Sequence, residues 1–126
     1  MERHAVIVAG FGFRSSAGLS SLRAALVQAQ HGLPSVTHLA TASDKVPALV
    51  PLAEALGLPL IGVLPERLVE APTLTSSAAS LAARRTDSVS EASALAAAGP
   101  GARLLSPRCI SADRTATCAI AEGYST

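Results

Sequence analysis

The 126 residues suffice for one domain with a buried core, and we expect residues 1–126 to form that single domain. Apolar residues make up 49% of the sequence, but charged residues, Pro or Gly interrupt every run well short of the roughly 20 residues of a membrane-spanning helix. The apolar run near the N-terminus is also too short for a signal peptide, so we expect a cytoplasmic protein without a membrane segment. A net charge of +1 and an aromatic content of 2% argue against a nucleic-acid partner.

Cys109 and Cys118 are the two cysteines of the chain. Without a secretory signal, they are better interpreted as reduced thiols than as a disulfide. The three histidines show no ligand spacing with either cysteine, so the sequence predicts no metal site and no cofactor. Cys109 stands beside Arg108, but no general base accompanies it, which argues against a nucleophilic role.

Apolar segments alternate with helical patterns along the chain. The predicted strands are 5–9, 36–41, 58–63, 103–106 and 115–121. The predicted helices lie between Ser16 and Gly32, between Pro47 and Gly57, over 76–85, and between Ser88 and Gly99, with a short helical turn at 65–68. Residues 124–126 are expected to be a loose tail.

This order of elements predicts an α/β domain of the three-layer α/β/α type. Strands separated by helices indicate a mainly parallel sheet with helices on both faces. The last two strands have no helix between them and are expected to form a hairpin, which makes the sheet of about five strands mixed. Ligands of such sheets bind beyond the carboxyl ends of the parallel strands.

The segment after the first strand, Gly10-Phe11-Gly12, begins like a dinucleotide-binding motif. The third glycine position is Ser15, however, and a lone G-x-G is a weak signal. The two glycines are also explained by a tight strand-to-helix turn. Arg14 is expected near the positive end of the next helix, where a cation is disfavoured. Its partner would be either an anionic ligand or a surface carboxylate.

Two further segments have the residue types of a helix cap, and the first of them also has a functional explanation. Thr41 to Asp44 either cap the coming helix or, together with Lys45, contribute to an anion site. Ser88 and Glu91 have the spacing of a capping box. The residues alone therefore indicate a small α/β binding domain without a recognisable catalytic set.

Several motifs together resemble the CobE/CbiG C-terminal domain family of cobalamin biosynthesis. They are Gly10-Phe11-Gly12-Phe13-Arg14, Leu39-Ala40-Thr41-Ala42 with Lys45, the stretch Leu52 to Leu60, Ser88-Val89-Ser90-Glu91-Ala92-Ser93-Ala94-Leu95, and Leu105-Ser106-Pro107-Arg108. The motifs occur in family order and cover nearly the whole chain. The chain departs from the family at Ser15-Ser16 and at Cys109, where other members often carry basic residues.

The resemblance implies a stand-alone CobE-like protein that binds a precorrin or a cobyrinic-acid-type corrinoid as a carrier or accessory factor, with another cobalamin-pathway enzyme as a possible partner. Because corrinoids bear several carboxylates, basic residues suit them as binding groups. The expected ligand-binding residues are Gly10, Phe11, Gly12, Phe13, Arg14, Thr41, Lys45 and Arg108. One alternative is an enzyme acting on a precorrin, such as a CbiG-like lactone-opening hydrolase, with Glu91 or a loop hydroxyl aiding proton transfer. The other is a nucleotide-binding module. The catalytic residues of such an enzyme are unknown.

Overall fold

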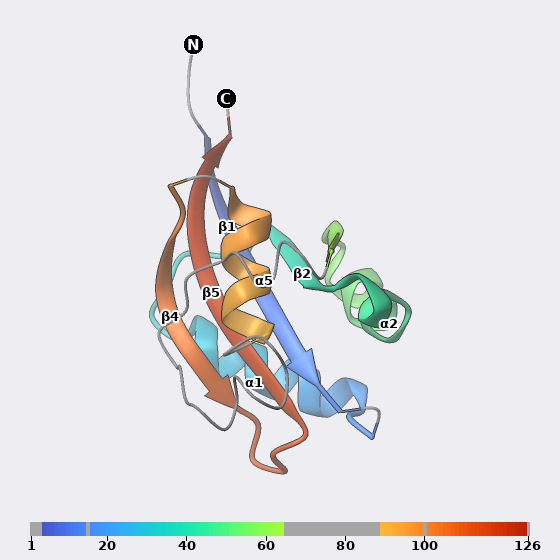
Figure 1. Ribbon diagram of the computed structural model, residues 1–126. Helices are drawn as coiled ribbons and strands as arrows, with labels where there is room; N and C mark the ends of the chain where they lie inside the picture. The colour runs from blue at the N-terminus through green and yellow to red at the C-terminus, as the bar shows by residue number, and fades with distance from the viewer. Residues whose placement is uncertain (1–3, 15, 65–88, 100, 126) are drawn as a thin grey trace, which may run out of the picture.

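A computed structural model describes residues 4–14, 16–64, 89–99 and 101–125 of the chain. Its strands form one five-stranded sheet, and its helices cover both faces of that sheet (Figure 1). In chain order they are β1 (His4–Phe13), α1 (Leu19–Gln30), β2 (His38–Ala42), the 3-10 helix η1 (Ser43–Lys45), α2 (Val46–Leu56), β3 (Leu60–Val63), α5 (Val89–Ala98), β4 (Arg103–Ile110) and β5 (Ala116–Ser125). The predicted three-layer α/β/α architecture is confirmed.

The sheet is mixed, as the sequence predicts, and its strand order is β3-β2-β1-β5-β4. β1 pairs in parallel with β2, and β2 pairs in parallel with β3. β5 is antiparallel to both of its neighbours, β1 and β4. β4 and β5 form the expected hairpin, so β4 runs in the same direction as β1.

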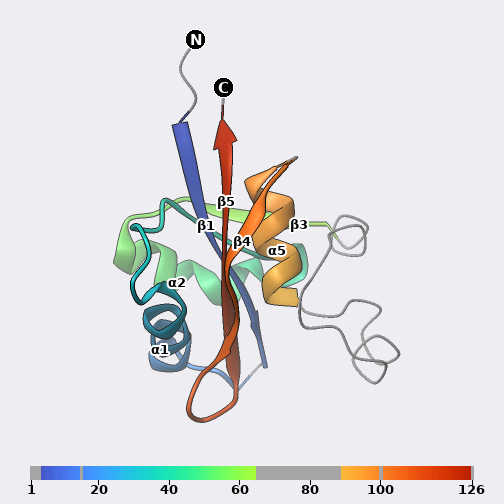
Figure 2. The same ribbon diagram turned by 90° about the vertical axis from the view of Figure 1, so that its left-hand side faces the viewer.

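The two faces of the sheet carry different cores. Figure 2 shows α1 and α2 on one side of the sheet and α5 on the other. The first face is filled by large side chains, including Phe11, Leu39 and Leu49. The second face holds small side chains, with Val8 and Ala40 of the sheet packed against the alanines of α5. A thin layer of small side chains brings α5 close to the strands.

Backbone contact between α5 and the sheet requires glycine at two positions. A Cβ atom added at Gly10 would lie 2.2 Å from the carbonyl oxygen of Ser90 and 2.5 Å from the nitrogen of Ala94. A Cβ atom at Gly123 would lie 2.1 Å from the carbonyl oxygen of Ala98. Real Cβ atoms do not approach so closely, so both ends of α5 rest on positions where only glycine fits.

Three expectations about local structure are wrong. Arg14 does not begin a helix: its N–H donates to Thr115 O at 2.9 Å, and α1 starts only at Leu19. Thr41 to Asp44 provide no side-chain cap for α2, whose N-cap residue is Lys45. Residues 124 and 125 are not a loose tail, because they belong to β5 and pair with residues 5 and 4 of β1.

Other expectations hold, or concern parts of the chain outside the described residues. Gly57 ends α2 in the left-handed conformation, with φ of 68°, as expected for a helix stop. The helix after Ser88 is confirmed as α5, but Ser88 itself lies outside the described residues, and so does its predicted cap. The helix predicted over 76–85 and the turn at 65–68 also lie outside them.

The turn of the β4–β5 hairpin is joined to α1 through the carboxylate of Asp113. Ser111 Oγ donates to Asp113 Oδ1 at 2.6 Å, and Thr115 donates to the same oxygen from its N–H and its hydroxyl, at 3.1 and 2.8 Å. Ser21 Oγ of α1 donates to Asp113 Oδ2. The hydrogen bonds from Ser111, Ser21 and Thr115 hold the pKa of Asp113 well below its usual range.

The contact between α5 and β1 predicts that Gly10→Ala is strongly destabilising. The new methyl group would overlap backbone atoms of Ser90 and Ala94, which cannot rotate away. We expect a loss of at least about 2 kcal/mol in the free energy of unfolding by urea. Gly18→Ala is the control, because nothing lies within 4 Å of its Cβ position. It should cost no more than about 1 kcal/mol, the difference between Gly and Ala at an N-cap. Equal losses in the two variants would contradict the close approach.

The lowered pKa of Asp113 predicts a pH-dependent contribution to stability. The ionised carboxylate stabilises the folded state fully above the unfolded-state pKa of about 3.9. That contribution is lost as the pH falls from there through the lower folded-state pKa. The difference in unfolding free energy between the parent and Asp113→Asn should therefore be constant near neutral pH and shrink below about pH 4. Urea titrations at a series of pH values measure it. Ser21→Ala, which removes one donor, should reduce the pH dependence, and an unchanged profile would argue against the hydrogen bond from α1.

Candidate functional site

The ends of four strands define one edge of the sheet, here called the carboxyl edge. β1, β2 and β3 end there because they pair in parallel, and β4 ends there because it shares the direction of β1. The chain leaves this edge at Arg14, Ser43 and Leu64. The segments expected to face a ligand therefore meet at one edge.

Lys45 and Phe13 come together at the carboxyl edge although they belong to different segments. Lys45 Nζ lies 5.6 Å from the centroid of the Phe13 ring, within the range of a cation–π contact. Phe13 and Lys45 are half-buried, and Arg14, which directly follows Phe13, is exposed. Two cations and one aromatic ring thus lie where β1 and β2 end.

Phe11, Thr41 and Gly10 lie in the interior. The side chain of Phe11 is fully buried in the core beneath α1 and α2. Thr41 is also fully buried, and its hydroxyl donates to Phe11 O at 2.9 Å. Gly10 lies against α5, as described above. These residues fix the positions of β1 and β2 relative to each other and to α5.

Gly12 brings the first turn of α5 to the carboxyl edge. Thr117 Oγ1 donates to Gly12 O at 3.0 Å. A Cβ atom at Gly12 would lie 3.0 Å from Thr117 Oγ1 and 3.3 Å from Val89 Cβ. The N-terminal end of a helix carries partial positive charge. The first turn of α5 therefore lies against Gly12, one residue before β1 ends.

Arg108 is exposed in the edge strand β4, between Ser106 and Cys109, where the pairing of β4 with β5 is irregular. Its N–H donates to Glu91 Oε2 at 3.0 Å. Glu91 is fully buried in the first turn of α5. The sequence predicted a cap or, in the enzyme alternative, proton transfer for Glu91, but not this bond, since no local pattern signals a bond between residues of two separate elements. The one signal in the sequence is the place of Glu91 within an alanine-rich helix, because a carboxylate buried there needs a hydrogen-bonding partner.

The three predicted cations are spread along the carboxyl edge. Arg14 follows β1, Lys45 follows β2, and Arg108 lies in β4 near its end. β1 and β5 lie between β2 and β4 in the sheet. The distance between β2 and β4 is therefore three strand spacings, or about 14 Å. A ligand that contacts all three cations would therefore be large.

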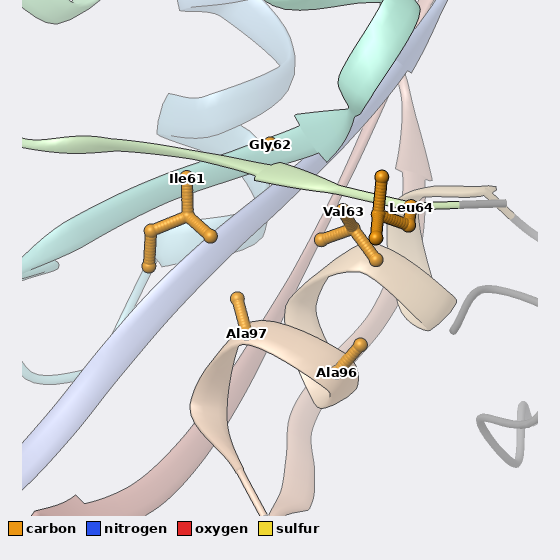
Figure 3. A pocket seen from close by; sticks show the side chains of 6 residues that line it. All are labelled: Ile61, Gly62, Val63, Leu64, Ala96 and Ala97. Carbon is orange, nitrogen blue, oxygen red and sulfur yellow. The ribbon is translucent and has the colours of Figure 1, made fainter. Parts of the chain in front are cut away.

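An apolar pocket lies between the end of β3 and the second half of α5 (Figure 3). Its volume is about 160 Å³. The lining residues are Ile61, Gly62, Val63, Leu64, Ala96 and Ala97. Pockets that enclose a drug-sized ligand usually measure about 300–1,000 Å³. This pocket is large enough only for a peripheral apolar group.

Within residues 4–14, 16–64, 89–99 and 101–125, no three His, Cys, Asp or Glu side chains come together as metal ligands. In the same part of the chain, no helix has the length and apolar character needed to cross a membrane.

Comparisons with known proteins place this fold in a biosynthetic context. Residues 7–121 match the family model described as the cobalamin synthesis G C-terminus. The chain is 32% identical to CobE, a protein from the cobalamin (vitamin B12) biosynthetic pathway, with a TM-score of 0.81 over 94% of this chain and 93% of that one. It is 39% identical to the cobalamin biosynthesis protein chiG from Agrobacterium tumefaciens strain C58, with a TM-score of 0.70 over 92% of this chain and 97% of that one.

A third crystal structure shares the fold at low sequence identity. It is a putative cobalamin biosynthesis protein G homolog from Sulfolobus solfataricus, with 19% identity and a TM-score of 0.73 over 93% of this chain but only 36% of that one. No curated protein sequence matches the chain. The family match and the two similar structures agree over almost the whole chain. The chain therefore belongs to the cobalamin synthesis G C-terminal family and is a cobalamin biosynthesis protein of the CobE/CbiG C-terminal type.

Proposed function

We propose that this protein binds a late precorrin or a cobyrinic-acid-type corrinoid at the carboxyl edge, as a carrier or accessory factor in the cytoplasm. Another enzyme of the cobalamin pathway would receive the ligand. The observation that supports this most directly is the placement of Arg14, Lys45 and Arg108 at the ends of three strands, β1, β2 and β4, which all end at one edge. A small anion would occupy one of these positions, whereas a macrocycle with several carboxylates can contact all three.

The chemistry of the edge suits such a ligand. Carboxylates on the rim of the ring would pair with Arg14 and Arg108 as bidentate forks and with Lys45 as a point charge. The ring of Phe13, already in contact with Lys45, offers apolar cover for the macrocycle. The small pocket beside β3 has room for a peripheral methyl group.

An enzyme that acts on a precorrin is the alternative from another class. Proton transfer needs a titratable group within hydrogen-bonding reach of the substrate. Glu91 is the sequence-predicted carboxylate candidate beside a loop hydroxyl, and its Oε2 accepts from the backbone N–H of Arg108 in the interior. This arrangement favours a positioning role for Glu91 and a binding role for the protein. A nucleotide-binding module is the weaker alternative, because Gly10 packs against α5.

Titration with cobyrinic acid tests the proposal. Corrinoids absorb visible light, so binding is followed by the change in absorbance at fixed ligand and increasing protein. The affinity should fall as salt is raised, because screening weakens exposed ion pairs. The absence of any change at tens of micromolar protein with each available late intermediate would refute the proposal. Conversion of a bound precorrin by the protein alone would establish the enzyme instead, and tight binding of ATP would favour the nucleotide module.

Substitution of the cations should weaken binding without unfolding the protein. We expect Lys45→Ala and Arg14→Ala each to raise the Kd about 5- to 150-fold, the equivalent of ~1–3 kcal/mol for a charge-assisted bond. Arg14→Lys should lose the bidentate geometry, whereas Lys45→Arg should keep part of the affinity. The melting temperature should change little, because Arg14 is exposed and the Lys45–Phe13 contact contributes only about 1 kcal/mol.

Arg103→Ala is the matched control. Arg103 is a cation of β4 at the opposite edge of the sheet, where its Nη2 lies 3.0 Å from Glu122 Oε1. The variant has the same change in net charge as Arg14→Ala, and an exposed ion pair contributes at most about 1 kcal/mol. Its Kd should match that of the parent. Equal losses of affinity in all three alanine variants would show a general charge effect and contradict the assigned site.

A further inference from the structure

Cys109 and Cys118 are direct cross-strand neighbours. Cys109 of β4 pairs with Cys118 of β5 in the antiparallel register. Residues directly opposite in such a pair have Cα atoms about 4.5 or 5.5 Å apart, according to the hydrogen-bonding position. Both values fall within the range of about 4.4–6.8 Å found for disulfides. The backbone of the hairpin therefore brings the two cysteines within bonding reach.

The two side chains project from the same face of the sheet. Cys118 belongs to the core beneath α1 and α2, and Cys109 packs against that same core. Directly opposite residues of an antiparallel pair share a face. Both cysteines are free in this structure. A bond between the sulfurs would need only local adjustment of the two side chains.

The two thiols differ in their access to solvent. Cys118 is fully buried, whereas Cys109 is half-buried. Burial raises the pKa of the Cys118 thiol, and the neighbouring Cys109 adds to the rise. Among the described residues, Cys109 Sγ has weak hydrogen-bonding partners, Ser106 Oγ at 3.8 Å and Pro107 O at 3.7 Å. Cys109 is thus the sulfur that a dissolved oxidant reaches first.

We propose that Cys109 and Cys118 form an oxidisable pair that closes a cross-strand disulfide when the protein meets hydrogen peroxide. The Cys109 sulfur attacks a peroxide oxygen, the O–O bond breaks, and a sulfenic acid and water are formed. The Cys118 sulfur then attacks Cys109 Sγ, the S–O bond breaks, and hydroxide leaves with the Cys118 proton as water. Two thiols are oxidised and one peroxide is reduced to two waters. A thiol reductant returns the disulfide to two thiols and is itself oxidised.

The position of the pair gives the bond a structural consequence. Arg108 precedes Cys109 in the irregular part of β4, and Cys118 pairs on its other side with Phe11 of β1. Closure would tie the outermost strand, β4, covalently to β5 beside Arg108. The proposal concerns the thiols alone and does not depend on corrinoid binding.

Treatment of the reduced protein with hydrogen peroxide, followed by intact mass measurement and tryptic mapping, tests the proposal. We expect the monomer to lose two hydrogens and both reactive thiols, and dithiothreitol to restore them. Trypsin cuts after Arg108 and Arg114, so the disulfide would join peptide 109–114 to peptide 115–126. Both thiols remaining free, disulfide-linked dimers, or stable addition of oxygen without loss of hydrogen would each overturn the proposal.

Single variants separate the roles of the two cysteines. Cys118→Ala should stop at the sulfenic acid of Cys109, which dimedone traps. Cys109→Ser should leave the buried Cys118 reduced under the same conditions. Modification of Cys118 at the same rate in Cys109→Ser as in the parent would contradict the order of attack. The mass measurement on the parent protein stays decisive if either variant folds poorly.

Discussion

The fit of α5 against the sheet depends on the absence of side chains at Gly10 and Gly123. Each of these glycines meets a backbone oxygen of the helix, one near its beginning and one at its end. A helix held at both ends cannot slide along the strands, so its first turn is fixed at the carboxyl edge. There Val89 meets Gly12, and Glu91 accepts the N–H of Arg108. The position of the first turn of α5 at the candidate site therefore depends on the contact between the backbone of α5 and the sheet.

Local patterns in the sequence predicted most of the fold, because they act over a few residues. The apolar run from Ala5 and the glycine after α2 need no distant partner to be interpreted, and the hairpin follows from a spacing alone. The role of the glycines of β1 was harder to predict. The neighbouring residues suggest a turn or a phosphate-binding loop, but glycine is needed there because α5, some 80 residues later in the chain, packs against them. Arg14 was misplaced for a related reason, because β1 continues to Phe13 through its long pairing with β5.

The candidate site was predicted in part for the same physical reasons. The rule that parallel strands end at one edge placed Arg14 and Lys45 after neighbouring strands at the same edge, and their basic character was visible in the sequence. Phe11 and Thr41 belong to the same motifs but alternate along their strands toward the interior. The predicted first strand ended at residue 9, whereas β1 extends to Phe13 between helices on both faces, so Phe11 lies within the sheet and not in a loop after it. The bond from Arg108 to Glu91 arises only in the tertiary structure.

The pairing of β1 with β5 extends to both outer ends, where His4 lies opposite Ser125. The described chain thus enters and leaves the sheet side by side, at the edge opposite the cations (Figure 1). Neighbouring ends allow a domain to be appended, inserted or circularly permuted with little disturbance. Sequence added at either end would begin on the far side from the proposed ligand. This geometry explains how one fold can occur both as a small protein and as about a third of a longer one, as in the Sulfolobus relative, where it covers 36% of the chain.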